Sequence, residues 1–151
     1  MSGSSTLLST LVVHVHLVSS LLMVGIIWTV QVVHYPLMAL VGTAQFASYE
    51  AAHAPRMAAV VMLPWAAQGV TVAWMLLTPP DGVATGLVLA AAAAAALPVL
   101  VTVTVSVPAH GRLARGFDAA VHRRLVATNW LRTAGWSVHG VIAVVISITA
   151  G

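Results

Sequence analysis

The chain has 151 residues, of which 60% are apolar and only 6% are charged, and its formal net charge is +3. A soluble domain of this size exposes too much surface to be covered by so few charges, so the composition excludes an ordinary soluble protein and predicts a lipid environment. The chain has no cysteine, which excludes disulfides, thiolate metal ligands and thiol redox chemistry.

All six basic residues are arginines, and most of them lie beside long apolar segments. In a soluble protein a net positive charge would point to nucleic acid. Beside apolar segments, arginines instead fix the orientation of a membrane protein, so we expect the lipid bilayer as a partner and no nucleic acid. Residues 1–6 lack the positive region of a signal peptide, and we expect the first apolar segment to be retained as a helix.

Four segments have the length of about 20 apolar residues that a membrane span needs. They are residues 7–33, 57–77, 83–107 and 125–150. Pro36 disfavours helical geometry at Tyr35, which predicts the end of the first span there.

Residues 37–54 are too polar to span a membrane, but apolar residues at helical spacing favour a short interfacial helix or an extension of the second span. Residues 78–82 predict a turn that makes the second and third spans a hairpin. The alanine run 90–96 predicts a close-packing surface, which is also a candidate contact with a second copy of the chain, and Pro98 predicts a kink. The sequence therefore predicts one all-α domain over residues 1–151, an integral membrane four-helix bundle with a short interfacial helix between the first two spans.

Threading the four spans up and down gives the bundle two unlike ends. Five arginines fall at one end and Asp81 falls in the turn at the other. The positive-inside rule predicts that the arginine-rich end is cytoplasmic and that both termini lie outside. The alanine- and arginine-rich, lysine-free composition suggests a bacterial cytoplasmic membrane.

The same threading brings six potential metal ligands to the arginine-rich end. Glu50 and His53 are three residues apart, the spacing from which di-iron sites in helical bundles are built. A complete di-iron site needs further glutamates, and Glu50 is the only one here. We predict a transition-metal site whose ligands are His34, Glu50, His53, Asp118 and His122. Imidazole suits copper, iron and zinc, so the metal stays open, and each histidine alone is also compatible with a hydrogen-bonded interface residue.

Arg132 lies about two turns inside the apolar part of the fourth span, where an arginine must face the bundle interior and find a partner. Glu50 is the predicted partner, either in a structural ion pair or as a carboxylate that Arg132 orients. Arg132, Asn129 and His110 are the candidate catalytic residues.

His16 and His139 lie at comparable depths nearer the other end of the bundle. A histidine pair across two helices is a candidate pair of haem ligands, and the alternative is a hydrogen-bonded pair.

Several short motifs resemble those of the small bacterial membrane proteins of the DUF1772, or anthrone-oxygenase-like, group. They are Val33-His34-Tyr35-Pro36, a linker with tyrosine and tryptophan nearby, Val107-Pro108, and Thr128-Asn129-Trp130-x-Arg132-Thr133. The resemblance implies a four-helix membrane bundle and, for the fungal and actinobacterial relatives, oxygenation of an anthrone to a quinone. The resemblance also implies that His34, Asn129 and Arg132 are the functional positions carried over from this group. This chain differs in Glu50-x-x-His53 and in His110, where the family typically has an asparagine.

The leading hypothesis is a membrane oxidoreductase or oxygenase that acts on a lipophilic aromatic or phenolic substrate with a histidine- and carboxylate-bound metal. A metal-free variant, in which histidine and glutamate deprotonate the substrate, also stays open. The alternatives are a haem- or quinone-binding electron-transfer protein, a small transporter, and an accessory subunit of a larger enzyme.

Overall fold

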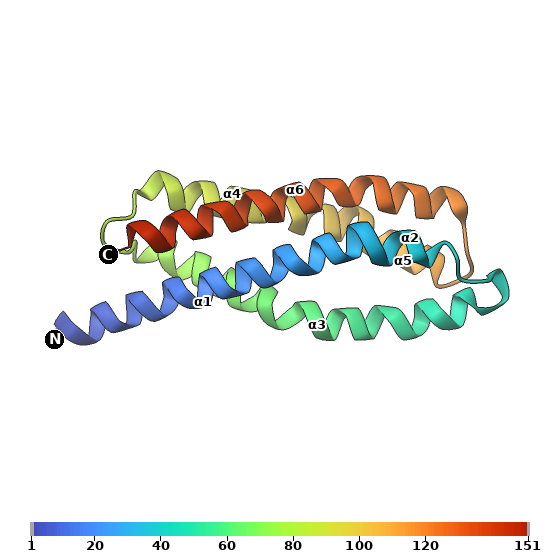
Figure 1. Cartoon of the computed structure of the whole chain (residues 1–151), viewed down its shortest axis with the longest axis horizontal. Helices are drawn as coiled ribbons and strands as arrows, with labels where there is room; N and C mark the ends of the chain where they lie inside the picture. The colour runs from blue at the N-terminus through green and yellow to red at the C-terminus, as the bar shows by residue number, and fades with distance from the viewer. Residues whose placement is uncertain (1, 151) are drawn as a thin grey trace.

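The computed structural model describes residues 2–150, with side chains described from residue 6 onward, and this part of the chain is an up-and-down bundle of helices without strands. Figure 1 shows both termini at one end of the elongated bundle, together with the 78–84 turn. The elements are α1 (Ser2–Thr29), η1 (Val30–His34), α2 (Tyr35–Met38), α3 (Thr43–Leu77), α4 (Thr85–Val101), η2 (Thr102–Ser106), α5 (Val107–Leu113) and α6 (Ala119–Thr149). The predicted all-α bundle of four long helices is confirmed, but the separate interfacial helix predicted between the first two spans is absent from the described residues, because most of that segment belongs to α3.

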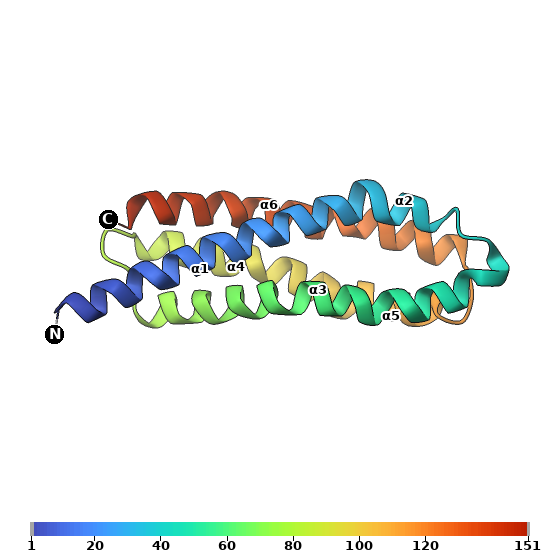
Figure 2. The same cartoon turned by 60° about the horizontal axis from the view of Figure 1, so that its bottom comes forward.

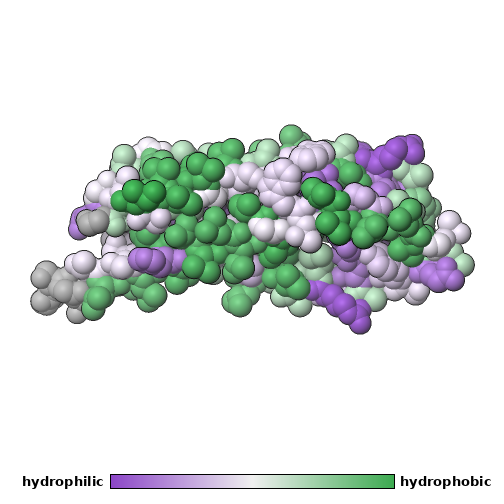
Figure 3. All heavy atoms as spheres, in the orientation of Figure 1, coloured by the Kyte–Doolittle hydropathy of each residue, from purple (hydrophilic) through white to green (hydrophobic). Residues whose placement is uncertain are grey.

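Four helical stretches are long and apolar enough to cross a membrane. They are Thr6–Met38, Thr43–Leu77, Thr85–Leu113 and Ala119–Thr149. The middle of the face in Figure 3 is covered by apolar residues, and the hydrophilic ones gather mainly toward the end with the 39–42 and 114–118 turns. We call this the arginine end. The chain therefore has the make-up of a multi-pass membrane protein.

The first span does not end at Tyr35, as the sequence predicted, but continues to Met38. The helix passes Pro36 through the π-helical turn η1, in which the Tyr35 N–H donates to the Val30 carbonyl five residues back. Pro36 then stands in the first turn of α2, where its missing N–H is tolerated.

The third span has the same construction. The π-turn η2 precedes Pro108, and the Val107 N–H donates to the Thr102 carbonyl. Single π-turns within α-helices occur frequently at functional sites.

Of the two alternatives for residues 37–54, the structure has the extension of the second span. Residues 39–42 form a turn, and α3 begins at Thr43 and runs without interruption past Pro55 and Pro64. Its first three turns lie at the arginine end, beside α5 (Figure 2).

Helix α6 is the most enclosed span, because it packs extensively against both α1 and α4. Two glycines permit this close approach: a Cβ on Gly135 would lie 2.8 Å from Pro98 Cδ of α4, and one on Gly140 would lie 2.7 Å from Val24 Cγ2 of α1. Helix α3 packs mainly against α1 and only lightly against α4. The bundle is therefore tight around α6 and loose beside α3.

Candidate functional site

A polar contact at the arginine end joins α3 to α5. Glu50 is 1% exposed, and its Oε1 accepts a hydrogen bond from His110 Nδ1 at 2.6 Å. In the described part of the chain this is the only contact between a carboxylate and a basic side chain. It makes His110 the partner of the buried carboxylate, and charge-assisted bonds of this kind are the strong ones.

Tyr35 extends this pair into a chain of three groups. Its hydroxyl lies 3.2 Å from His110 Nε2. Since Nδ1 of a neutral ring carries the proton given to Glu50, Nε2 has the lone pair that accepts the Tyr35 O–H. Carboxylate, imidazole and phenol thus form a continuous relay.

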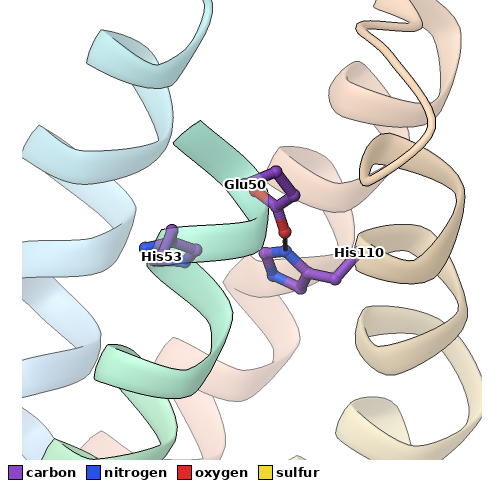
Figure 4. A group of neighbouring side chains, drawn as sticks. All are labelled: Glu50, His53 and His110. Carbon is purple, nitrogen blue, oxygen red and sulfur yellow. Dashed lines mark hydrogen bonds and ion pairs between the residues drawn. The ribbon is translucent and has the colours of Figure 1, made fainter. Parts of the chain in front are cut away.

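His53 lies one turn beyond Glu50 on α3 and faces the same pair. One potential ligand atom from each of Glu50, His53 and His110 lies within 4.8 Å of the other two. Figure 4 shows the carboxylate and the His110 ring joined by their hydrogen bond, with the His53 ring beside them. Two imidazoles and one carboxylate from two helices therefore form a group that is able to hold a metal ion.

His34 reaches this group from η1 through ring contacts. Its imidazole stacks on that of His53 with 4.3 Å between ring centroids and 20° between planes. The Tyr49 hydroxyl lies 3.5 Å from His34 Nε2, at the outer limit of a hydrogen bond. His34 thus stands beside the Glu50–His53–His110 group rather than within it.

Arg132 belongs to a second polar network, on α6. Its Nη1 donates to Asn129 Oδ1 at 2.9 Å, and Asn129 Nδ2 donates to Gln31 Oε1 at 2.8 Å. Arg132 and Tyr35 line the same cavity, which brings the two networks together. The predicted Arg132–Glu50 ion pair is not formed: the basic partner of the Glu50 carboxylate is His110, and Arg132 Nη1 donates to Asn129.

These groups surround one end of a cavity of about 540 Å³ between the helices. His34, Tyr35, Glu50, His53, His110 and Arg132 line that end. The rest of the lining is mainly apolar and includes Met23, Ile27, Met57, Trp65 and Trp136. An apolar cavity of several hundred Å³ with a few converging polar groups is typical of a small-molecule site.

The cavity reaches the outer surface between α3 and α5. Ala54 and Ala58 of α3 and Gly111 and Ala114 on the opposite side line the cavity and are also exposed. These small, exposed lining residues mark the seam between α3 and α5 as the place where the cavity comes nearest to the lipid-facing surface.

Asp118 and His122, two of the predicted metal ligands, have other roles. Asp118 is the N-cap of α6: its Oδ1 accepts from the N–H groups of Ala120 and Val121 at 2.8 and 3.0 Å. These backbone N–H groups hold the pKa of the exposed Asp118 carboxyl below its ordinary value.

His122 Nε2 donates to the Tyr35 carbonyl at 2.9 Å. That carbonyl is free because the Ala39 N–H turns to the Pro36 carbonyl instead. The structure thus uses Asp118 Oδ1 in a helix cap and His122 Nε2 in a backbone contact, and it does not bring either residue into the group formed by Glu50, His53 and His110.

The haem prediction for His16 and His139 does not fit either. Their rings touch edge to face with 5.0 Å between centroids, which leaves no room for a porphyrin between them. The two rings are not hydrogen-bonded to each other: His16 Nδ1 lies 2.9 Å from Thr71 Oγ1, and His139 Nδ1 donates to the Ala91 carbonyl at 2.8 Å.

Comparison of the chain with models of known protein families, with curated proteins and with solved structures finds no match. The resemblance to the anthrone-oxygenase-like group therefore stays a prediction.

Sequence reasoning missed Tyr35 as a functional residue. The feature that could have indicated it is the position of Tyr35 immediately before Pro36, where the helix has to change its geometry and the side chains therefore change direction. A buried tyrosine hydroxyl usually finds a hydrogen-bond partner, so a tyrosine between a histidine and a proline in a membrane helix indicates a polar contact.

Proposed function

We propose that the protein is a membrane-embedded oxidoreductase of the oxygenase type that acts on a lipophilic aromatic or phenolic substrate with a metal ion bound by Glu50, His53 and His110. The observation that supports this proposal is the set of two histidines and one carboxylate in the wall of an apolar cavity. Two histidines and one carboxylate with open positions are the ligand set of non-haem iron(II) oxygenases. Iron is therefore preferred to copper and zinc.

The surrounding residues fit such an ion. A metal ion needs the lone pair of His110 Nδ1, so the proton that Nδ1 shares with Glu50 would move to Nε2 of the same ring when the ion binds. The other nitrogen of His110 then donates to the Tyr35 hydroxyl, and this kind of outer contact holds a metal-bound imidazole in orientation. When bound, iron(II) would supply activation of dioxygen at an open position.

Two further residues are placed to handle the substrate. His34 lines the cavity without belonging to the ligand group, so it is available to take a proton from an acidic phenol or methylene group. The Arg132 Nε–H is buried and lacks a partner, which suits it to stabilise the negative charge that develops on the substrate oxygen.

The reaction that the resemblance implies balances without an external reductant. A methylene group between aromatic rings reacts with one dioxygen molecule to give a ketone and one water molecule. Both hydrogens of the methylene leave in the water, and dioxygen accepts the four electrons. The lateral opening between α3 and α5 suits a substrate that arrives dissolved in the bilayer.

A metal-free version of the same oxygenation is the second candidate. The Glu50–His110–Tyr35 relay, with distances of 2.6 and 3.2 Å, is complete without an ion. In this version His110 or His34 deprotonates the substrate, and the resulting carbanion or phenolate reacts with dioxygen directly.

The deciding experiment is elemental analysis with a visible spectrum on protein purified in detergent without added metal. We expect about one iron per chain in the wild type and in His14→Ala, an exposed histidine on α1 that serves as the matched control, and loss of iron in His53→Ala and His110→Ala. Oxygen uptake with hydrophobic phenols should follow the iron content. Activity without any metal would favour the metal-free version, and neither metal nor activity would contradict the oxygenase proposal.

We further infer that the arginine end faces the cytoplasm of a bacterium and that both termini lie outside. This orientation rests on the positive-inside rule. Because the chain has no cysteine, single cysteines at Asp81 and Gly116 can be labelled without background. Labelling of D81C but not of G116C by an impermeant reagent on intact cells would support the orientation, and the reverse pattern would contradict it.

A further inference from the structure

Several residues that line the cavity carry buried polar atoms that no group of the protein satisfies. Among the described residues, seven buried side-chain nitrogen or oxygen atoms have no hydrogen-bond partner, and four of them belong to residues that line the cavity. These four atoms are Glu50 Oε2, Ser106 Oγ, Arg132 Nε and Trp136 Nε1. Buried polar groups in proteins are nearly always hydrogen-bonded, so this concentration in one cavity points to a ligand.

Two of these atoms are donors on one face of α6. Arg132 and Trp136 are four residues apart, so their side chains leave the helix one turn apart, with about 5–6 Å between Cβ atoms. Guanidinium and indole N–H groups donate and never accept. A ligand that satisfies these two N–H groups must therefore carry hydrogen-bond acceptors.

Neither donor is free to turn to another partner. The guanidinium is fixed by the bond from Nη1 to Asn129. The Trp136 ring is 2% exposed and meets the rings of Trp65 and His139 almost perpendicularly, at 6.4 and 6.1 Å between centroids. Arg132 stands near the metal-ligand group, whereas Trp136 lies one turn deeper in the apolar part of the cavity.

We propose that Arg132 Nε and Trp136 Nε1 are a two-point donor for a ligand with two acceptor oxygens. The ligand would be an apolar ring compound that carries two carbonyl-type oxygens, one for each donor. One oxygen accepts from Arg132 at the reactive end, and the other accepts from Trp136 at the deep end. This inference rests on the proposed function in placing the substrate in this cavity, and it adds Trp136 as a residue that determines specificity.

Binding of size-matched probes tests the proposal without any turnover. The probes are naphthalene, 1-tetralone and 1,4-naphthoquinone, which carry no, one and two carbonyl oxygens. Equilibrium dialysis is carried out with the whole protein in lipid nanodiscs, without oxygen. The chain has neither cysteine nor lysine, so a quinone finds no thiol or lysine amine with which to react.

We expect the dione to bind about tenfold more tightly than the monoketone, as one added hydrogen bond allows. Trp136→Phe keeps an aromatic ring but removes the N–H, and it should reduce dione affinity to that of the monoketone. Trp130→Phe, on the exposed face of the same helix, should change nothing. Equal dione affinity in the wild type and in Trp136→Phe would overturn the proposal.

A measurement on the unaltered chain keeps the test valid if Trp136→Phe does not fold. In ¹⁵N-labelled protein the Trp136 indole N–H resonance should move downfield on titration with the dione and stay in place with naphthalene. No shift with saturating dione would also overturn the proposal. These measurements need neither metal nor oxygen, so they separate the two proposals. Tight dione binding by a protein without oxygenase activity would contradict only the proposed function. Oxygen uptake by a protein that binds the dione and the monoketone equally would contradict only the proposed donor pair.

Discussion

Glu50 is the only glutamate of the chain, and its carboxylate is buried among helices that otherwise carry few charges. An isolated charge in such a place is costly unless it is paired. His110 supplies the partner, and the second carboxylate oxygen stays unbonded. The residue is therefore better explained as a ligand or base than as a structural group, because a purely structural pair leaves no buried oxygen unused.

The first prediction concerns the charge of Glu50. Glu50→Gln keeps the size and one carbonyl-type oxygen but removes the negative charge that a metal ion requires. We expect loss of bound iron and a fall in oxygen uptake of about 100-fold or more, since even groups in the outer contacts of a metal site affect affinity or activity 10–100-fold. Metal content and uptake are measured on the same preparation, and unchanged iron would contradict the assigned ligand set.

The variant Tyr35→Phe distinguishes the metal-dependent from the metal-free version of the reaction. Tyr35→Phe removes the hydroxyl that contacts His110 but leaves all three candidate ligands. With a metal, iron should be retained and uptake should fall about tenfold, the lower end for an outer contact. In the metal-free version the relay is broken, and the loss should equal that of Glu50→Gln. If oxygen uptake fell by the same factor in Tyr35→Phe as in Glu50→Gln, the metal-dependent version would be excluded.

The residue pattern predicted part of this site. The spacing of Glu50 and His53 puts both on one helical face wherever the helix lies, so that pair followed from the sequence alone. Asp118 and His122 have an equally good spacing, but an aspartate that precedes a helix is also the commonest kind of cap. The sequence has no means of distinguishing a cap from a ligand before the first residue of α6 is known.

At the scale of elements, the Asp118 cap makes the start of α6 sensitive to pH. Its folded pKa is lowered by the N–H groups of Val121 and Ala120, so the cap stabilises the fold above the unfolded pKa of about 3.9 and the effect is lost as pH falls through the lower folded value. We expect the thermal midpoint of the wild type to drop between pH 5 and about 2.5 by more than that of Asp118→Asn. Parallel pH profiles of the two proteins would contradict this assignment.

The glycines of α6 give a prediction about packing. Gly135→Ala places a methyl group 2.8 Å from the rigid Pro98 ring and 3.3 Å from the Ala94 carbonyl, so we expect about 1–3 kcal/mol of destabilisation. Gly25→Ala on α1 is the control, because nothing lies within 4 Å of its new Cβ. Unfolding in mixed micelles measures both, and a stable Gly135→Ala protein would mean that α4 and α6 are free to move apart.

The positions of the spans were predictable, but their ends were not. Hydropathy finds apolar stretches and fixes their number and order. Pro36 was interpreted as a terminator because a proline removes one helical hydrogen bond, and a π-turn solves the same problem without ending the helix. Which solution applies depends on the helices packed around it, here on His122 and α6, and these contacts are remote in the sequence.

At the scale of the whole molecule, the uneven packing of the bundle predicts how a substrate enters. Ala54 lines the cavity and is exposed at the seam between α3 and α5. Ala54→Trp should obstruct the seam and lower oxygen uptake about tenfold with iron content unchanged, as expected when access rather than chemistry is limiting. Leu63→Trp, on the exposed face of the same helix, should have no effect. Equal activities would place the entrance elsewhere.

The two π-turns change the directions in which the side chains that follow them leave their helices. Each adds one residue to a helical turn, which rotates everything beyond it by about 100° relative to an unbroken α-helix. Tyr35 lies just beyond one of these turns and His110 lies beyond the other, and their side chains contact each other at the cavity. Deleting one residue from each turn would leave four intact apolar spans with Tyr35 and His110 pointing in other directions. The apolar composition of the helices thus determines that they can span a membrane, whereas the π-turns determine which side chains face the cavity.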